Sequence, residues 1–500
     1  MIQSSGLAAA VAPRRIGRAH YYPNVTDAEW NDWKWQFRNR VTDLDQLMKL
    51  LPIPENEREL RREVLRDFRM GIPPYYMALI DADDPHDPIL RQAVPIAEEY
   101  TYRDVGDEDP LGEESYSPVP GITHRYPDRV LMVISNSCAV YCRYCTRKRI
   151  MYEDAVPEME IDRMVDYIAR TKTVRDVVVS GGDPLTNSTA KLESILAKLR
   201  AIPHLEIIRI GTRVPVSLPQ RIDAELCEML QKYHPLWINV HFNHPRECTP
   251  EAARACDLLS RAGIPLNNQA VLLKGVNDSV ETMKGLVHGL MKMRVRPYYV
   301  YHCDPVRGSE HMRTTIAKGL EIMEGLRGHT SGLAIPQYVI DAPGGGGKVP
   351  VNPNYLLHYD PKKQRAILRN FQGRIFEYYE QLPEEEMLQR RLVASANATP
   401  AAGPIALTSS HAPRAPELPA AATPAAKEVR TRLSRAAANG NVNGKGGAKS
   451  NGAHAANGTH AGGAPAPQGP GSIAPAPPAT ETVVGKSKWA HRGRARRDPS

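Results

Sequence analysis

Three closely spaced cysteines carry the clearest chemical signal in this chain of 500 residues. Cys138, Cys142 and Cys145 have C-x3-C-x2-C spacing and directly follow the apolar run 130–134. One short loop can therefore direct three thiolates at a common centre. A structural zinc site usually has four protein ligands, whereas three ligands leave one position open for chemistry. An iron–sulfur cluster bound by three cysteines likewise leaves one iron open. The spacing alone keeps zinc and a cluster as alternatives.

The elements that must position this loop form a regular alternation after residue 129. Apolar runs predict six strands, at 130–135, 176–180, 205–210, 236–240, 266–273 and 296–301. Helical stretches are predicted at 160–171, 191–200, 222–233, 250–262, 279–293 and 309–326. Such an alternation forms a parallel sheet with crossover helices. We therefore predict an α/β fold, an incomplete (βα)6 barrel, with the cysteine loop at the carboxyl ends of the strands, where barrel enzymes carry their active sites.

A glycine pair follows the second predicted strand. Gly181 and Gly182 precede Asp183 in the sequence SGGDP. Glycines at a strand end let backbone groups approach a ligand closely. The same pair is also compatible with a simple tight turn.

Polar side chains mark the ends of three further strands. Arg213 closes the segment after the third strand, and Asn239 and His241 alternate along the fourth. Residues two apart on a strand share one face. Gln269 on the fifth strand is expected to point the same way. If that face is the barrel interior, these side chains line a cofactor.

A second glycine-rich segment lies near residue 345. Four successive glycines, Gly344, Gly345, Gly346 and Gly347, precede Lys348. Such a backbone can wrap a phosphate with its amides, and a lysine presented there suits Schiff-base chemistry once it is shielded from water. The glycine spacing and the missing Ser or Thr after the lysine exclude a nucleotide-binding P-loop. A flexible linker remains the alternative.

The cysteine motif, with Tyr144 before its last cysteine, resembles the signature of radical S-adenosylmethionine enzymes. The glycine pair with Asp183 resembles their GGE/GGD element. Segments 31–36, 118–129, 218–221 and 241–244, together with those around Asp304 and 341–348, are similar to the pyridoxal-phosphate-dependent lysine 2,3-aminomutases. The resemblance extends from about residue 25 to residue 379.

This resemblance implies cofactors and residue roles. The three cysteines would hold a [4Fe–4S] cluster whose open iron binds S-adenosylmethionine, and Lys348 would form a Schiff base with pyridoxal phosphate. Arg147 would bind the substrate carboxylate, while Asp304 and Asp341 would bind the distal ammonium group. Further cofactor contacts are expected from Arg125, Gly181, Gly182, Asp183, Arg213, Asn239, His241, Gln269 and the glycines 344–347.

The implied reaction is an exchange of L-lysine and L-β-lysine by a 2,3-amino shift through a 5′-deoxyadenosyl radical. Two carboxylates favour a cationic substrate tail. Arginine as a substrate would need acidic residues as well, and the positive charge of Arg307 nearby keeps glutamate as a further alternative substrate. A zinc-loop nucleic-acid-binding protein is the non-enzymatic alternative. The family's zinc site at a subunit contact is expected to be absent, since Ser279 follows Asp278 and no cysteine follows Cys303.

Composition divides the chain into four expected parts. Residues 1–110 form a helical, oligomerising region, 111–335 the barrel, 336–392 the segment with Lys348, and 393–500 a disordered Ala/Pro/Gly-rich basic tail. The tail has thirteen Lys and Arg against four Asp and Glu, so it accounts for the formal net charge of +8. The basic end of the tail could contact nucleic acid, but a solubilising role without a fixed partner is expected instead. No membrane is expected, because no stretch approaches the roughly twenty apolar residues that span a bilayer. Scattered cysteines indicate a cytoplasmic protein, with a homo-oligomeric state and a flavodoxin- or ferredoxin-type electron donor implied by the resemblance.

Overall fold

The computed structural model describes residues 15–151, 156–381 and 384–396. The chain is divided after residue 398 into two units. The described residues all belong to the first unit. The predicted disordered tail, from residue 393 onward, lies outside the described residues except for its first four.

One curved sheet organises the chain, with its strands adjacent in sequence order from β1 to β9. Its strands are β1 (Ile122–Tyr126), β2 (Arg129–Ser135), β3 (Asp176–Gly181), β4 (Ile207–Gly211), β5 (Leu236–Val240), β6 (Leu266–Leu272), β7 (Arg296–His302), β8 (Gln337–Ala342) and β9 (Gly347–Pro350). Strands β2 to β8 run parallel, and β1 and β9 are antiparallel edges. The α/β prediction is confirmed, and the six predicted strands correspond to β2 to β7. The sequence analysis did not predict β8, a seventh parallel strand.

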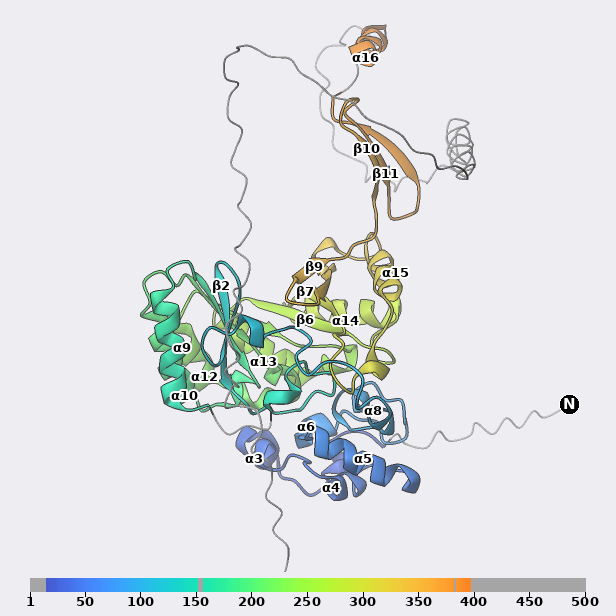
Figure 1. Ribbon diagram of the computed structural model, residues 1–500. Coiled ribbons are helices and arrows are strands. Elements are labelled where there is room, and N and C mark those ends of the chain that lie inside the picture. The colour runs from blue at the N-terminus through green and yellow to red at the C-terminus, as the bar shows by residue number, and fades with distance from the viewer. Residues whose placement is uncertain (1–14, 152–155, 382–383, 397–500) are drawn as a thin grey trace, which may run out of the picture. The chain divides into compact units, whose positions relative to one another are not determined.

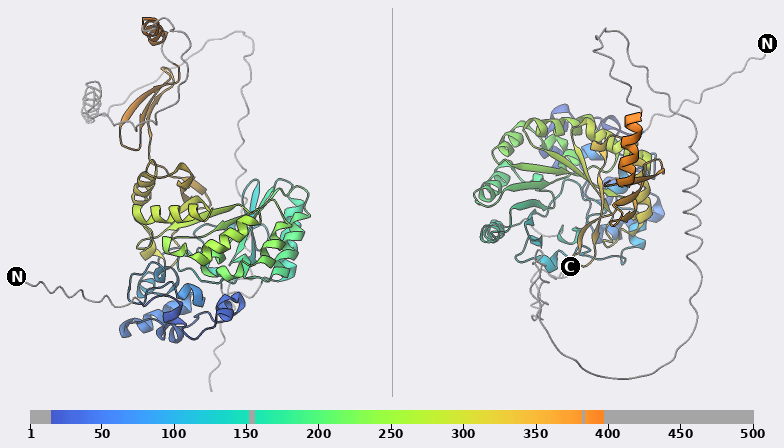
Figure 2. Two further views of the ribbon diagram at one scale, coloured as in Figure 1. Left: turned by 180° about the vertical axis from the view of Figure 1, so that it is seen from behind. Right: turned by 90° about the horizontal axis from the view of Figure 1, so that it is seen from above.

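Amphipathic helices cover the outer face of this sheet (Figure 2). They are α9 (Glu158–Arg170), α10 (Thr189–Arg200), α12 (Ala224–Gln231), α13 (Pro250–Arg261), α14 (Val280–Lys292) and α15 (Ile316–Leu326). In α10, Leu192, Ile195, Leu196 and Leu199 are buried at helical spacing, and the Ser188 hydroxyl caps the first turn. Each helix therefore buries one apolar face against the sheet, and α13, α14 and α15 contact β6, β7 and β8, the strands that follow them.

Strand alternation defines the inner side of the barrel. In β6 the even-numbered residues from Leu266 to Leu272 are buried, whereas Asn267, Gln269 and Val271 are half-buried. The buried set packs beneath the helices, so the half-buried set faces inward. Gln269 pairs with Tyr299 and Asn267 with Asn239 in register. The predicted inward row thus includes the residues expected to line a cofactor.

The helices before the sheet lie together at the lower side of the barrel in Figure 1, and the Gly71 and Gln92 carbonyls in this region accept bonds from the cysteine loop. They are α1 (Arg18–Tyr21), α2 (Asp27–Asn31), α3 (Trp33–Arg38), α4 (Leu44–Met48), α5 (Glu55–Asp67), α6 (Pro74–Met77), α7 (Leu90–Ala93) and α8 (Ala97–Thr101). Thr26 caps α2 in a capping box with Glu29. Trp30 is buried, and the Trp33 ring lies 4.8 Å from the Arg221 guanidinium. These tryptophans pack within the chain, while an oligomerising role for the region stays a prediction.

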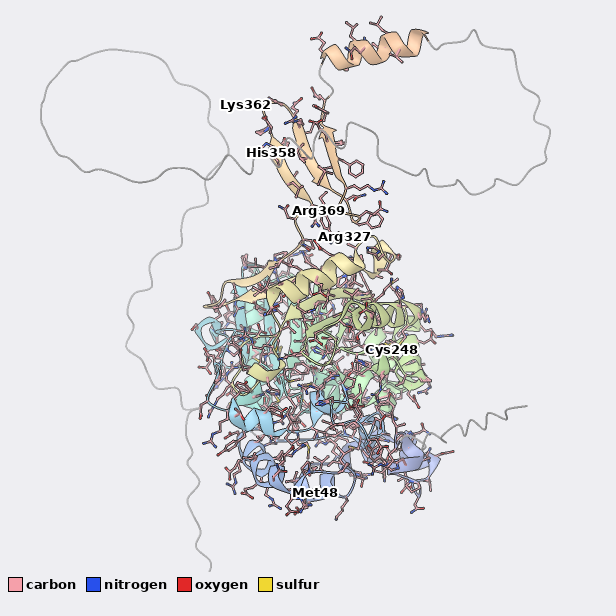
Figure 3. The ribbon with its side chains drawn as sticks, turned by 90° about the vertical axis from the view of Figure 1, so that its right-hand side faces the viewer. Met48, Cys248, Arg327, His358, Lys362 and Arg369 are labelled. Carbon is pink, nitrogen blue, oxygen red and sulfur yellow. The ribbon has the colours of Figure 1, made fainter. Side chains whose placement is uncertain are left out.

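A separate antiparallel sheet follows the barrel. It consists of β10 (Leu356–Asp360), β11 (Arg365–Arg369) and β12 (Ile375–Tyr379), and α16 (Glu384–Ala396) comes after it. Arg327 after α15 and Arg369 of β11 both lie 5.5 Å from the Tyr355 ring (Figure 3). Because β8 and β9 belong to the barrel sheet, the expected 336–392 segment is divided between the two sheets.

Candidate active site

The cysteine loop after β2 is enclosed by the N-terminal helices. The Tyr141 amide donates to the Gly71 carbonyl at 3.2 Å, and the Arg143 backbone amide donates to the Gln92 backbone carbonyl at 2.9 Å. The Arg143 side chain is fully buried and pairs with Glu99 at 2.7 Å. A buried pair of this kind strongly favours one arrangement because breaking it leaves an uncompensated charge. The loop is therefore held in place from residues far away in the sequence.

The three cysteine thiols are close to this buried scaffold. Burial is the main cause that raises the pKa of Cys138 well above its usual value and also raises the pKa of Cys145. Thiolates at such sites need a positive partner, which a metal centre supplies. Among the described residues, no three His, Cys, Asp or Glu side chains converge on a single metal ion. A cluster binds each thiolate at a different iron, so three thiols can hold it without converging on one ion.

The glycine pair packs against the start of the cysteine loop. The Gly182 amide donates to the Ser135 carbonyl at 2.5 Å, and the Asp183 amide donates to the Ser137 carbonyl at 2.8 Å. A Cβ atom at Gly182 would lie 2.5 Å from the Ser137 oxygen. Glycine is required here because two backbones approach closely. The pair thus joins β3 to the cysteine loop, and a direct contact with a cofactor stays a prediction.

Asp183 points into the protein. Its carboxylate accepts hydrogen bonds from the Thr212 hydroxyl and from the Arg213 amide, both at 2.7 Å. Burial raises its pKa, although these donors favour the carboxylate. Asp183 thus connects the ends of β3 and β4 in this structure, and a direct cofactor contact stays a prediction.

His241 and Tyr144 form a stacked pair at the end of β5. Their ring centroids lie 5.8 Å apart with an interplanar angle of 16°. The Nε2 atom of His241 is buried without a hydrogen-bond partner among the described residues. Burial, with a smaller contribution from Arg213, lowers the pKa of His241 to about 3, so the ring is neutral. An unpartnered buried nitrogen of this kind fits a bound cofactor.

Asn239 and Gln269 lie on the same inner row. Asn239 is buried, and its side-chain oxygen accepts a bond from Asn267 at 3.4 Å. Gln269 is half-buried. Asn243 lies beyond the end of β5, and its side chain is bonded to Tyr144, Gln92 and the Val271 amide.

A second group of charges gathers at the end of β8. Lys348 Nζ lies 3.3 Å from one Asp341 oxygen, and an Arg125 nitrogen lies 3.4 Å from the other. Asp341 and Arg125 are buried at 6% and 10% side-chain exposure, while Lys348 is 34% exposed. Burial and then the Asp341 carboxylate raise the pKa of Asp304 to about 7, and Lys348 opposes this shift. The structure therefore brings Asp304, Asp341, Arg125 and Lys348 together.

The glycine-rich segment is the tight turn of a β-hairpin. Asp341 pairs with Lys348, and Ala342 with Gly347, across β8 and β9. Gly344, Gly345 and Gly347 have φ angles of 67°, 81° and 75°, which favour glycine. The Lys348 amide donates to the Tyr126 hydroxyl at 3.0 Å. The flexible-linker alternative is therefore wrong, because residues from β1 and the hairpin hold Lys348 opposite Asp341.

Arg147 has an acidic partner that the sequence analysis missed. Its guanidinium contacts Glu113 at 2.6 Å and donates to the Ser180 hydroxyl at 3.2 Å. Burial alone would raise the pKa of Glu113, but Arg147 and Arg149 lower it. The acidic run 107–109 with Glu113 and Glu114 was the available signal.

Arg307 does not face the Asp304 carboxylate group. It lies on the surface, where it bonds Glu108 at 2.8 Å and approaches Asp104 at 3.5 Å. Lys148, beside the cysteine loop, donates to the Arg307 carbonyl at 3.1 Å. The loop after β7 is thus joined to the cysteine loop. The cysteine loop follows β2 and Asp341 lies at the end of β8, so both lie at the carboxyl ends of the parallel strands.

Comparison with known proteins agrees with this geometry. Residues 132–286 match the model of the radical SAM superfamily, and residues 323–399 match the lysine-2,3-aminomutase model. The chain is 56% identical to the L-lysine 2,3-aminomutase of Fusobacterium nucleatum, over 73% of this chain and 85% of that one. The chain belongs to the lysine 2,3-aminomutase family. The L-lysine 2,3-aminomutase of Clostridium subterminale is 55% identical, over 73% and 87% of the two chains. The glutamate 2,3-aminomutase of Clostridioides difficile is 46% identical, over 70% and 83%.

Family membership establishes the chemistry in outline. As a radical SAM aminomutase, this protein is an isomerase that uses S-adenosylmethionine and a [4Fe–4S] cluster, acts on a small molecule and needs a reductant. The predicted family is confirmed, and the nucleic-acid-binding alternative is set aside. Within residues 15–396 as described, no helix combines the length and the apolar character needed to cross a bilayer.

Proposed function

We propose that this aminomutase interconverts L-lysine and L-β-lysine, with pyridoxal phosphate bound at Lys348. The contact between Asp341 and Lys348 carries the proposal. A primary ammonium group already occupies Asp341 at 3.3 Å, and Lys348 there stands in for the distal ammonium of the substrate. Once the Lys348 nitrogen is taken up by the cofactor, Asp341 is left for a substrate ammonium.

Asp304 supports a cationic substrate in preference to glutamate. Its carboxylate is close enough to Asp341 for the Asp341 charge to help raise the pKa of Asp304. Two carboxylates in a shielded site stabilise a substrate ammonium and repel the side-chain carboxylate of glutamate. Arg307, the charge that kept glutamate open, is engaged elsewhere. This arrangement supports the activity named for the lysine-specific relatives.

Arg147 would hold the substrate carboxylate while Glu113 holds Arg147. A guanidinium has five N–H donors. In Arg147, Nε and one N–H of Nη2 donate to Glu113, and one N–H of Nη1 donates to the Ser180 hydroxyl. One donor on each terminal nitrogen is not used in these bonds, and that edge suits a carboxylate. Glu113 and Ser180 thus orient Arg147 for the substrate.

Residues of the inner row support the remaining cofactor sites. Cys138, Cys142 and Cys145 would hold the cluster, and His241, Asn239 and Gln269 would contact S-adenosylmethionine. The cluster and S-adenosylmethionine supply radical chemistry, and pyridoxal phosphate supplies carbonyl chemistry at the substrate nitrogen. The hairpin glycines 344–347 and Arg125 are the candidates for the phosphate end of pyridoxal phosphate.

Asn substitutions at the two carboxylates test the substrate. Asp304→Asn and Asp341→Asn should each lower kcat/KM for lysine roughly 13- to 160-fold, since a hydrogen bond to a charged group is worth about 1.5–3 kcal/mol. Asp257→Asn, at a surface carboxylate of α13, is the matched control. Activity should be measured with lysine, arginine and glutamate in parallel. Wild-type preference for glutamate, or unchanged kcat/KM in both variants, would refute the proposal.

The pH dependence of KM gives a second prediction. Asp304 has a pKa of about 7, mainly through burial, so it is largely protonated below that pH. A bound ammonium requires the carboxylate form, so binding must release a proton at low pH. The KM for lysine should rise as pH falls below about 7, by up to about tenfold per unit, and level off above it. Asp304→Asn should remove this dependence, and a flat wild-type profile would contradict the assignment.

Four further properties are part of the proposal. A flavodoxin- or ferredoxin-type protein would supply the electron, and the enzyme would form a homo-oligomer without the family's zinc site. All seven cysteines are free thiols, which suits a reducing cytoplasm.

A further inference from the structure

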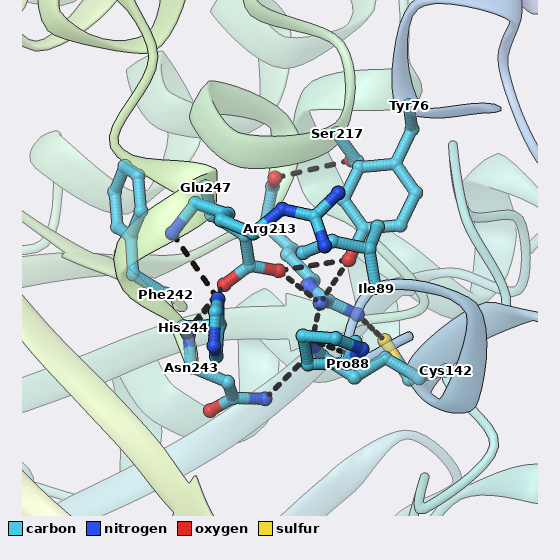
Figure 4. Close-up of polar contacts among 12 residues, drawn as sticks. Tyr76, Pro88, Ile89, Cys142, Arg213, Ser217, Phe242, Asn243, His244 and Glu247 are labelled. Carbon is cyan, nitrogen blue, oxygen red and sulfur yellow. Dashed lines mark hydrogen bonds and ion pairs between the residues drawn. The ribbon is translucent and has the colours of Figure 1, made fainter. Parts of the chain in front are cut away.

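The guanidinium of Arg213 is enclosed by three polar side chains beneath the cysteine loop (Figure 4). Its Nη2 atom donates to the Tyr76 hydroxyl at 2.8 Å, to the Gln92 side-chain oxygen at 2.6 Å and to a Glu247 oxygen at 2.8 Å. The Arg213 and Glu247 side chains are 7% and 0% exposed. We call these four residues the arginine clamp.

The clamp is itself fixed by further bonds. The second Glu247 oxygen accepts the Asn243 amide at 2.6 Å and the His244 amide at 2.9 Å. The Tyr76 hydroxyl donates to the first Glu247 oxygen at 2.8 Å. Displacing the guanidinium would leave buried polar groups unpaired, which is costly. Arg213 therefore has one strongly preferred position.

In that position the second terminal nitrogen of Arg213 faces a cysteine. Nη1 lies 2.7 Å from Cys142 Sγ. The other two thiols have different neighbours: Cys145 Sγ accepts the Arg147 amide at 3.4 Å, and Cys138 Sγ lies 3.8 Å from the Met151 sulfur. Among the described residues, only Cys142 of these three is bonded by a cationic side chain. This asymmetry is not needed for holding a cluster.

We propose that Arg213 raises the reduction potential of the [4Fe–4S] cluster through its bond to Cys142. The proposal rests on the assignment of the cluster to the three cysteines. One electron from a low-potential one-electron donor converts [4Fe–4S]2+ to [4Fe–4S]+, with no bond formed or broken. The added negative charge strengthens a cationic hydrogen bond to the ligand sulfur. Glu247 lies beyond the guanidinium and partly offsets its charge.

Two substitutions with opposite expected effects test this role. In Arg213→Gln the cluster should become about tenfold harder to reduce, which corresponds to a midpoint potential about 59 mV lower for one electron. In Glu247→Gln the guanidinium loses its neutralising partner, so the midpoint should rise. Arg221→Gln is the matched control, because Arg221 is also fully buried but bonds the Leu185 and Asn187 carbonyls instead of a cysteine. Its midpoint should equal that of the wild type.

The measurement is a redox titration of the anaerobically reconstituted full-length protein with dithionite, followed by electron paramagnetic resonance. Iron content of the wild type separately tests the cluster assignment. A less than twofold change in the reduction equilibrium of an iron-replete Arg213→Gln protein would overturn the proposal. If that variant holds no iron, an unchanged or lower midpoint in Glu247→Gln overturns it and a higher one supports it. Loss of iron from both variants would make the clamp a folding device and overturn it too.

Discussion

Replacing Lys348 by alanine is expected to lower turnover at least about 10⁴-fold, because no other described amine is held opposite Asp341 in the hairpin. Wild-type protein should show the absorbance of bound pyridoxal phosphate, and borohydride should trap the cofactor on the peptide that contains Lys348. Lys348→Ala should lose both signals. Its iron content should stay unchanged, since the cysteines are on a different loop.

The matched control for this substitution is Lys362→Ala. Lys362 is exposed in the turn between β10 and β11 (Figure 3), so its removal should leave activity and cofactor binding intact. Cofactor trapped on another lysine of the wild type, or substantial turnover in Lys348→Ala, would place the carbonyl chemistry elsewhere.

Removing any one thiol of the cysteine loop is expected to abolish activity by preventing cluster assembly. Cys138→Ala, Cys142→Ala and Cys145→Ala should each lose most of their iron and the brown colour of the cluster after anaerobic reconstitution. Each thiolate is expected to bind a separate iron, and the protein offers no convergent His, Cys, Asp or Glu group among the described residues as a substitute. Iron per chain and visible absorbance measure the effect.

Cys256→Ala is the appropriate control for these three variants. Cys256 is a fully buried free thiol on α13, away from the loop. Its loss should cost some stability through a small cavity but leave iron and turnover in place. If a cysteine-loop variant bound iron as fully as Cys256→Ala, the cluster would need another site.

Much of the barrel could be read from local sequence patterns. Strand β5 coincides with its predicted bounds, and α13 with its Thr249 cap begins where the periodicity predicted. Burial on one face and a fixed repeat of 2 or 3.6 residues leave a clear trace in sequence. Strand β8 was missed because the run before the glycines was not counted as part of the sheet.

The partners of the candidate site could not be read in this way. Glu247 and Tyr76 are 171 residues apart, yet they bond at 2.8 Å. Glu99 supports Arg143 from 44 residues away. Each of these residues looks like an ordinary charged or aromatic side chain, since contact between distant segments has no local period.

Residue types and their spacing define the chemistry that is available: three thiols in one loop, a lysine after glycines and two aspartates. Long-range packing gives these groups their partners, which are Asp341 opposite Lys348, Glu113 on Arg147 and the arginine clamp on Cys142. The reason is physical. Residue type sets which bonds a side chain can make, whereas burial and long-range packing select the one partner that satisfies its charge.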